Sequence, residues 1–334
     1  MRIPPVHNGC ALAFVIGGFY QKCAAFAGRF ESHQLSGPSR GANFKPPLYT
    51  KRAAADRTPQ PARNRSDQET AVTVIDFTAF IGRLATTSGE TILPFFRTSL
   101  SIDNKATTHD FDPVTEADRA AEAVMRRLIK ANFPQHGIVG EEFGNEREDA
   151  EYVWVLDPID GTKSFIAGFP IWGTLIALLH RGTPVFGMMH QPFIGERFSG
   201  DSGSAHYHGP SGQRKLAVRR CASLKDATSF TTSPLLMNTA DRAAFSRVEA
   251  EVRLTRYGGD CYSYCMLAAG HLDLVIETEL KPYDIAALIP IITGAGGVVT
   301  TWEGKPAQNG GRIIAAGDPR VHEAAMKLLA SAGP

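Results

Sequence analysis

The sequence predicts an α+β protein in which helices and sheets are stacked in layers. Three observations carry this prediction. Apolar residues near positions 80 and 120 recur at the spacing of an amphipathic helix. The middle of the chain holds short apolar runs separated by turn residues, which is the pattern of an antiparallel meander. The final third alternates again between helical and strand-like segments.

The composition is that of an ordinary globular protein. The chain has 334 residues, of which 43% are apolar and 21% charged, enough for two subdomains that share a large core. The net charge of +1 argues against a dedicated nucleic-acid binder, and no apolar run approaches the roughly 20 residues of a membrane span. We therefore expect neither a nucleic acid nor a membrane as partner. The five cysteines lack zinc or disulfide spacing, which favours reduced thiols and a cytoplasmic protein.

Residues 1–70 differ from the rest of the chain. They contain ten basic and four acidic residues and seven of the 21 prolines, and their apolar residues follow no sustained helical or alternating pattern. The apolar patch 11–20, followed by the small residues Ala25 and Ala27, allows a secretion signal as one interpretation. Because one arginine and no lysine precede the patch, we favour a disordered extension or a start codon assigned too early.

Two helices are expected at the start of the folded part. The first runs from Ile75 to about Arg97 and is weakened near Gly89 and Pro94. The second opens at Thr115–Asp118, which resembles a capping box. Its buried stripe is predicted to consist of six residues: Ala117, Ala121, Val124, Met125, Leu128 and Ile129.

Strands follow these helices. The apolar segment Tyr152–Leu156 is expected to be a buried strand. Three further runs, with a turn at Gly182–Pro184, predict antiparallel pairing: Thr174–Leu179, Val185–His190 and Glu196–Ser199.

The second half is expected to alternate helices and strands beyond a seam near residues 210–230. The predicted helices are Cys261–Ala269, Ile285–Ala295 and Val321–Ala330, and the predicted strands are Leu272–Ile276 and Val298–Thr301. We therefore expect an N-terminal α+β subdomain of residues 71–213 and a C-terminal α/β subdomain of residues 214–334.

The run Asp157–Thr162, with the sequence Asp-Pro-Ile-Asp-Gly-Thr, carries the strongest functional signal. A carboxylate buried at the end of a strand is costly unless a cation neutralises it. The proline favours extended backbone before it, so the Ile159 carbonyl and the Asp160 carboxylate can turn to one side. Gly161 and Thr162 then offer backbone N–H groups at a helix start, where phosphate is favoured.

Five acids stand at predicted element boundaries: Asp118, Glu141, Asp157, Asp160 and Asp284. A helix cap is the ordinary explanation for Asp118 or Asp284 alone, and Glu141 followed by Glu142 is by itself a solvated pair. Oxygen ligands are what hard divalent cations prefer. The five together favour metal-assisted chemistry on a phosphate ester.

Three motifs resemble the inositol monophosphatase family of Mg²⁺-dependent phosphatases: Gly140–Glu142, Asp157–Thr162 and Pro282–Asp284. The resemblance runs from about Ile75 to Ala330 and implies the layered αβαβα sandwich of the sugar phosphatases. Three segments resemble the histidinol-phosphate phosphatase branch of that family: Gly258–Tyr262, Ala269–Asp273 and Leu280–Asp284. Where inositol monophosphatases have a tryptophan before the last metal aspartate, this chain has Tyr283.

The resemblance implies a role for each site residue. The metal ligands would be Glu141, Asp157, the Ile159 carbonyl, Asp160 and Asp284. Asp157 would bridge two ions, and Asp118 and Thr162 would orient the attacking water or accept its proton. Phosphate and alcohol would be bound by Gly161, Thr162, Lys163, Gly259, Asp260 and Glu277. Lys163 is equally well explained as a surface residue.

The expected protein is a phosphoric monoester hydrolase that converts L-histidinol phosphate to L-histidinol and phosphate in histidine biosynthesis. Two or three Mg²⁺ ions are the expected cofactor, with Mn²⁺ as an alternative, and the family implies a homodimer. One alternative is an inositol monophosphatase or another phosphatase of small metabolites. Another is a non-catalytic phosphate-binding regulator, which the complete set of five acids argues against. His190, His206 and His208 are expected to be surface residues rather than ligands of a second metal type.

Overall fold

The computed structural model describes residues 77–98, 102–104, 113–201 and 203–330. The predicted extension 1–70 and the predicted helix start at Ile75 lie outside these residues.

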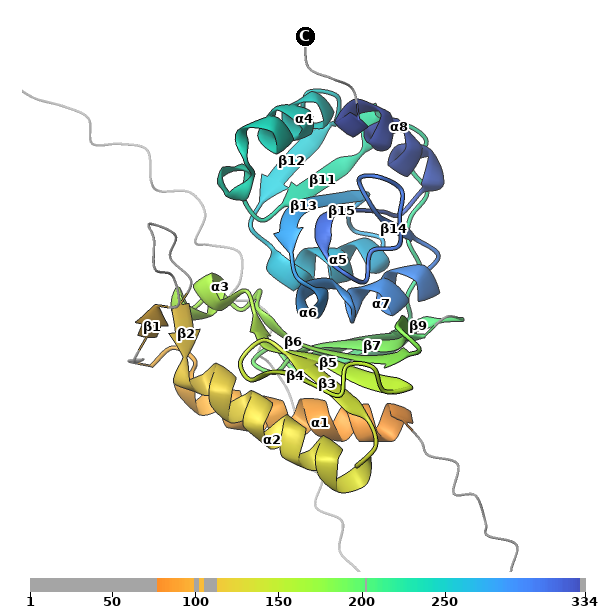
Figure 1. The fold of residues 1–334 in the computed structure, drawn as a ribbon. Helices are drawn as coiled ribbons and strands as arrows, with labels where there is room; N and C mark the ends of the chain where they lie inside the picture. Colours follow the sequence, from red (N-terminus) through yellow and green to blue (C-terminus); the bar gives the residue numbers. More distant parts are fainter. Residues whose placement is uncertain (1–76, 99–101, 105–112, 202, 331–334) are drawn as a thin grey trace, which may run out of the picture. The chain divides into compact units, whose positions relative to one another are not determined.

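Helices and sheets form five layers, as Figure 1 shows. Two helices cover the outer face of an eight-stranded sheet: α1 (Phe77–Ile92) and α2 (Glu116–Asn132). Three lie between this sheet and a five-stranded sheet: α5 (Asp260–Ala268), α6 (Pro282–Ile285) and α7 (Leu288–Gly294). Two cover the far face of the second sheet: α4 (Thr239–Glu249) and α8 (Pro319–Ala330). The predicted αβαβα sandwich is confirmed.

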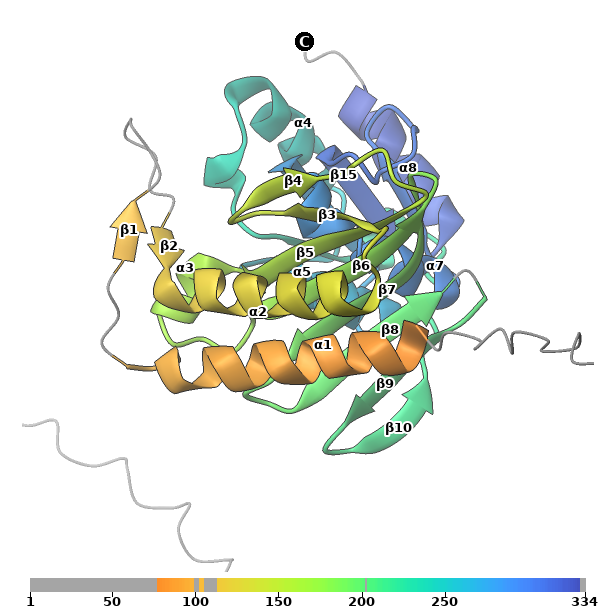
Figure 2. The ribbon, with the colours of Figure 1, turned by 60° about the horizontal axis from the view of Figure 1, so that its bottom comes forward.

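The first layer is formed by α1 and α2, which lie side by side across the sheet (Figure 2). Helix α1 ends at Ile92, earlier than predicted, and continues as the 3₁₀ turn η1 (Leu93–Phe95). Pro94 lacks the N–H group that an α-helix would need there. A short antiparallel ribbon of β1 (Ile102–Asn104) and β2 (Pro113–Thr115) precedes α2.

The predicted stripe of α2 is only partly right. Four of its six residues are buried: Ala117, Ala121, Met125 and Ile129. Val124 and Leu128 are half-buried, whereas Glu122 and Arg126 are buried, at 0% and 5% exposure. A search for apolar periodicity cannot find two charged side chains that pair with each other inside the protein.

The eight-stranded sheet contains the predicted meander. Its order is β10 (Gly212–Lys215), β9 (Ala205–Gly209), β8 (Glu196–Asp201), β7 (Thr183–Gln191), β6 (Gly173–His180), β5 (Tyr152–Asp160), β3 (Gly137–Gly140) and β4 (Gly144–Glu146). Strands β6, β7 and β8 pair antiparallel, as predicted, whereas β3 and β5 are parallel. The expected subdomain limit between residues 213 and 214 falls within β10, and the division into subdomains stays a prediction.

The five-stranded sheet lies in the second half of the chain. Its order is β12 (Leu254–Tyr257), β11 (Thr228–Thr231), β13 (Leu274–Leu280), β15 (Gly311–Ala316) and β14 (Val298–Thr301). The predicted helix over Ile285–Ala295 is divided into α6 and α7, because Pro290 cannot donate to the carbonyl of Ala286 between them. Three short helical turns complete the fold: α3 (Thr162–Ile166), η2 (Leu224–Asp226) and η3 (Pro234–Leu236).

Side chains of β5 alternate between two parts of the core. Trp154 and Leu156 pack with α1 and α2 in one apolar cluster. Val155 packs in another cluster, with residues of α5 and α7. The alternation continues along a regular strand, so Asp157 is directed to the same side as Val155, toward the middle helical layer.

Candidate active site

A β-bulge at the end of β5 brings two carboxylates to one side of the sheet. Asp157 pairs with Leu175 and Asp160 with Gly173, so β5 has one residue more than β6 over this stretch. Residues three apart on a regular strand point to opposite faces, and one extra residue reverses this relation. The bulge contains Pro158, which has no N–H to donate to the ladder. It therefore directs both carboxylates toward the middle helical layer.

Glu141 reaches the same place because β3 and β5 are parallel neighbours. Gly140, the last residue of β3, pairs with Leu156, so Glu141 follows β3 at the level where Asp157 follows Leu156 in β5. The Glu141 N–H donates to the Leu156 carbonyl at 3.4 Å. This register places a third carboxylate beside the bulge.

Two further acids come from helices. Asp284 lies in α6, and its carboxylate accepts a hydrogen bond from the Lys281 N–H at 2.7 Å, so it also caps its own helix. Carboxylate oxygens of Asp157, Asp160 and Asp284 all lie within 4.8 Å of one another. Asp118 is buried in the first turn of α2. Four elements therefore contribute to one acidic centre.

Burial and crowding raise the pKa values of the aspartates on β5. The pKa of Asp157 is raised well above its ordinary value by burial and then by four carboxylates: Glu141, Asp160, Asp284 and Asp118. The pKa of Asp160 is likewise raised well above its ordinary value by burial, by Asp284 and by Asp260. Carboxylates this close cannot all remain charged unless a cation neutralises them.

The donor set of this centre fits a hard divalent cation. Carboxylate oxygens and a backbone carbonyl, such as that of Ile159, are the ligands that Mg²⁺ accepts. The Oδ1 atom of Asp157 is buried with no hydrogen-bond partner among the described residues. Burying a carboxylate oxygen in this way costs free energy, which a bound cation would offset. The predicted Mg²⁺ ligands are thus present, and Mn²⁺ accepts the same oxygen set.

The chain turns sharply after the bulge. Gly161 has a φ of +86°, and a Cβ there would lie 2.8 Å from Asp260 Oδ2, so two constraints favour glycine. Helix α3 begins at the next residue, and the Thr162 hydroxyl donates to the Ile159 carbonyl at 3.1 Å. Gly161 and Thr162 therefore lie beside the acidic centre, as expected from the sequence.

The start of α5 packs against this turn. Gly259 precedes the helix, and Asp260 adopts a left-handed backbone with a φ of +42°. The Cys261 N–H donates to Asp160 Oδ2 at 2.6 Å, and the Ser164 hydroxyl donates to Asp260 Oδ2 at 2.6 Å. A non-glycine residue at positive φ is uncommon and often marks a functional position.

Glu277, on β13, contributes a carboxylate to a pocket beside the acidic centre. It accepts hydrogen bonds from the Thr232 N–H at 2.5 Å and the Thr231 hydroxyl at 3.2 Å. Burial raises the pKa of Glu277 to about 7, although these hydrogen bonds oppose the shift. The residues that line the pocket include Asp160, Thr232, Asp260, Tyr264, Glu277 and Asp284. The structure thus brings the predicted substrate residues Asp260 and Glu277 into one pocket with two of the predicted metal ligands, Asp160 and Asp284.

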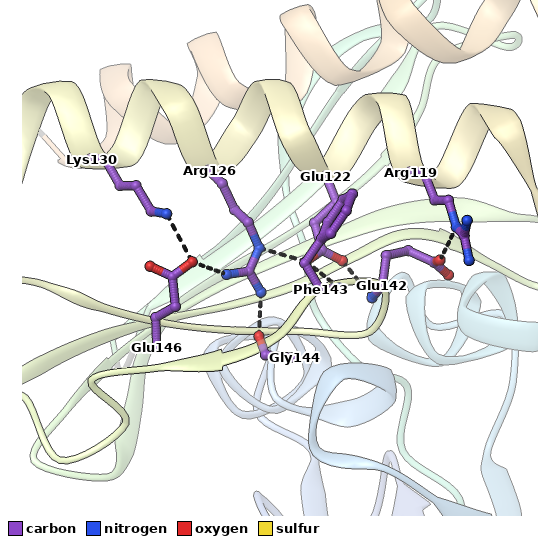
Figure 3. Close-up of polar contacts among 8 residues, drawn as sticks. All are labelled: Arg119, Glu122, Arg126, Lys130, Glu142, Phe143, Gly144 and Glu146. Carbon is purple, nitrogen blue, oxygen red and sulfur yellow. Dashed lines mark hydrogen bonds and ion pairs between the residues drawn. The ribbon is translucent and has the colours of Figure 1, made fainter.

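Sequence reasoning missed a polar network next to this centre, drawn in Figure 3. Glu122 of α2 accepts hydrogen bonds from the N–H groups of Glu142 and Phe143, directly after Glu141. Arg126, one turn further along, pairs with Glu122. A glutamate four residues before an arginine is a recognisable helix pattern, but nothing in the sequence shows that the pair is buried.

The three histidines were predicted to lie at the surface, and this was wrong for one of them. His206 and His208 are exposed, whereas His190 is buried in β7. Its Nδ1 atom lies 3.1 Å from the Glu196 carbonyl oxygen, and burial lowers its pKa to about 4. Its position near the end of a strand that pairs on both sides, with Thr174 of β6 and Arg197 of β8, explains the error.

Known proteins share this sequence and fold. The bifunctional phosphatase IMPL2, chloroplastic, of Arabidopsis thaliana is 44% identical over 279 residues, covering 80% of this chain and 79% of the relative. A histidinol-phosphatase of Chlorobaculum parvum is 34% identical over 223 residues, covering 66% of this chain and 84% of the relative. The solved structure of an inositol monophosphatase from Zymomonas mobilis has a TM-score of 0.68 and 42% identity, covering 76% of this chain and 99% of that one.

The five-layer fold and its acidic centre are those of a phosphoric monoester hydrolase that acts on small phosphorylated substrates. The chain belongs to the inositol monophosphatase family, whose model matches residues 75–333. The sequence motifs that predicted this family are the same segments that the fold gathers at the acidic centre.

None of the helices in the described part of the chain is long and apolar enough to cross a lipid bilayer.

Proposed function

We propose that this protein is a Mg²⁺-dependent phosphatase that hydrolyses L-histidinol phosphate to L-histidinol and phosphate. The observation that carries the proposal is the pocket beside the acidic centre, whose lining includes the carboxylates of Asp260 and Glu277. Two carboxylates suit an alcohol that bears a protonated amine and an imidazole, as histidinol does. The likeness to a protein named histidinol-phosphatase supports the same substrate.

The acids of the centre are proposed to hold the cations. Glu141, Asp157 and the Ile159 carbonyl would bind one ion. Asp157, Asp160 and Asp284 would bind another. Bound there, paired divalent cations lower the pKa of water and neutralise charge on the departing alcohol oxygen.

The remaining residues are proposed to orient water and phosphate. Asp118 is buried close enough to Asp157 to raise the pKa of that residue, a position from which it can accept a proton from the attacking water. The hydroxyl of Thr162 would help to orient that water. The backbone N–H groups of Gly161 and Thr162 would bind the phosphate oxygens. Burial raises the pKa of Asp260, and Lys163 lies near enough to oppose that shift, so its ammonium group can also serve an anionic substrate.

Inositol monophosphate is the second candidate substrate. The solved inositol monophosphatase at 42% identity favours it, and a glutamate at position 277 can also accept hydrogen bonds from sugar-like hydroxyls. The homodimer and the cytoplasmic location expected from the sequence stay predictions.

Phosphate release from the full chain with Mg²⁺ tests the proposal. The substrates are L-histidinol phosphate, inositol 1-phosphate and fructose 1,6-bisphosphate, and we expect the highest kcat/KM for histidinol phosphate. Asp260→Asn and Glu277→Gln should lower kcat/KM more for histidinol phosphate than for the other two. A higher value for inositol phosphate would overturn the substrate, and no Mg²⁺-dependent release from any ester would overturn the activity.

A further inference from the structure

We propose that Glu122 and Arg126 of α2 are positioning residues that fix the placement of Glu141 and thereby set the affinity of the acidic centre for its divalent cation. The inference rests on the proposed function, since it assigns Glu141 to that cation. Neither residue touches the substrate pocket in the described structure, and neither belongs to the set of five acids.

Glu122 holds the backbone that follows Glu141. Its side chain is fully buried, and both of its oxygens are used. Oε2 accepts the N–H of Glu142 at 2.7 Å, and Oε1 accepts the N–H of Phe143 at 3.2 Å (Figure 3). A buried carboxylate in contact with two consecutive N–H groups fixes the course of that peptide segment.

Arg126 holds the next part of the same loop. Its Nε atom donates to Glu122 Oε1 at 2.6 Å, and its Nη1 atom donates to Glu146 Oε1 at 3.0 Å. Its Nη2 atom donates to the Gly144 carbonyl. The guanidinium thus fixes Glu122 on one side and the start of β4 on the other, with a planar set of donors that lysine cannot reproduce.

The residue before Glu141 also contacts the pair. A Cβ at Gly140 would lie 2.2 Å from Glu122 Oε1 and 2.7 Å from Arg126 Nη2, so the glycine backbone packs directly on the two side chains. The residues on both sides of Glu141, Gly140 and Glu142, are therefore held against α2. A shift of the loop away from α2 would carry Glu141 with it.

The pair also connects two parts of the acidic centre. Asp118, Glu122 and Arg126 are spaced by four residues along α2 and so lie on one face of the helix. The first belongs to the acidic centre, and the other two hold the loop that carries Glu141. Residues that orient metal ligands through hydrogen bonds commonly change metal affinity by about 10- to 100-fold when they are replaced.

The chain offers a matched control in its second half. Asp273 is buried at 1% exposure and accepts hydrogen bonds from Arg219 Nε at 2.7 Å and from the Thr228 N–H at 2.7 Å. This pair has the same chemistry, a buried carboxylate that joins an arginine to backbone, but it holds β11 rather than a loop of the acidic centre. Substitutions in this control pair therefore show what a loss of general stability does by itself, without a displacement of Glu141.

The experiment compares four variants of the full chain: Glu122→Gln, Arg126→Met, Asp273→Asn and Arg219→Met. Mn²⁺ alone is the probe, and its dissociation constant is measured by calorimetry and by electron paramagnetic resonance, with urea unfolding measured alongside. We expect Glu122→Gln and Arg126→Met to raise the Mn²⁺ dissociation constant by about tenfold or more. The two control variants should lose stability but keep a dissociation constant within about twofold of the wild type.

Two results would overturn the positioning role. One is an unchanged Mn²⁺ dissociation constant in folded Glu122→Gln and Arg126→Met proteins, and the other is an equal increase in the control pair. If one of the two variants fails to fold, Arg126→Lys, which keeps the charge but not the planar fork, should give a smaller increase in the same direction. A wild-type protein that binds no Mn²⁺ and cleaves no phosphate ester would contradict the proposed function itself. Mn²⁺ binding by the wild type together with an unchanged Mn²⁺ dissociation constant in Glu122→Gln would contradict only the positioning role.

Discussion

Asp157 lies in an electrostatically unfavourable environment in the native structure. It is buried, four other carboxylates raise its pKa, and one of its oxygens has no hydrogen-bond partner in the described part of the chain. Such an arrangement destabilises the metal-free protein, because desolvation and like charges both oppose ionisation. A bound cation would reverse the sign of that contribution, so under the proposed function Asp157 would serve the activity at the expense of stability.

Replacement of Asp157 by asparagine should separate these two effects. Asparagine keeps the size of the side chain but removes one of the crowded charges, so the metal-free variant should unfold at a temperature equal to or above that of the wild type. Its stabilisation by Mg²⁺ should be lost, and kcat should fall more than tenfold. Differential scanning calorimetry with EDTA and with Mg²⁺, together with phosphate release, measures all three. The exposed Asp149→Asn variant serves as control, and an activity loss of less than tenfold in Asp157→Asn would contradict a bridging role.

Glu277 should make the stability of the protein depend on pH. Its pKa is about 7 in the folded chain, against an ordinary value of 4.5. Between these values the unfolded chain releases the proton while the native state keeps it, so native stability falls as pH rises from 4.5 to 7 and is then constant. The full difference is about 3 kcal/mol at most. The free energy of unfolding is measured with urea in EDTA at pH 5 and pH 7.5. Its decrease between these pH values should be smaller for Glu277→Gln than for the wild type, and equal decreases would refute this explanation.

At the scale of elements, the site depends on two local features: the bulge of β5 and the close contact of the β3–β4 loop with α2. The bulge turns Asp157 and Asp160 to one side. The loop contact leaves no room for a side chain at Gly140, where a Cβ would meet Glu122 Oε1 at 2.2 Å. In both features it is the course of the backbone that determines where the acidic side chains lie.

The substitution Gly140→Ala should therefore destabilise the protein. The added methyl group must displace the buried Glu122–Arg126 pair, and overpacking of this kind costs about 1–3 kcal/mol. Gly82→Ala is the matched control, because Gly82 lies within α1 and the nearest atom to its Cβ position is 4.0 Å away. Alanine there should stabilise by about 1 kcal/mol through helix propensity. Chemical denaturation gives the sign of the change in the free energy of unfolding for both variants. An unchanged free energy of unfolding in Gly140→Ala would show that the loop can move away from α2.

The elements themselves were predictable where one physical signal dominated. The strand Val298–Thr301 and the meander agree with the structure because turn residues clearly separate these short strand-like runs from their neighbours. The break between α6 and α7, at Ala286 and Ala287, was missed because the surrounding residues are strongly apolar and suggested one continuous helix. Glu122 and His190 were missed for the same reason: their burial depends on partners from other elements, which periodicity does not contain.

At the scale of the molecule, the acidic centre joins the two halves of the chain. Asp118, Glu141, Asp157 and Asp160 come from the first sheet and its helix, whereas Asp284 belongs to the second half. Like charges from both halves repel each other without a cation, and a shared cation should hold them together. Under the proposed function, binding of the cation would therefore contribute directly to the stability of the folded chain.

Mg²⁺ should raise the unfolding temperature of the wild type. A ligand at about 100 times its dissociation constant stabilises the native state by about 2.7 kcal/mol. Thermal unfolding with increasing Mg²⁺ measures the shift, and Asp284→Asn, which removes the only one of the five acids from the second half, should reduce it strongly. A shift of the same size in this variant would show that the cation stabilises the protein elsewhere.

Anomalous diffraction from crystals soaked in Mn²⁺ is the decisive test of cation binding at the acidic centre, because it locates the ions without any assumption about the substrate. We expect anomalous peaks in contact with Asp157, flanked by Glu141 on one side and by Asp160 and Asp284 on the other. Well-defined peaks elsewhere in the protein, with none at Asp157, would contradict it.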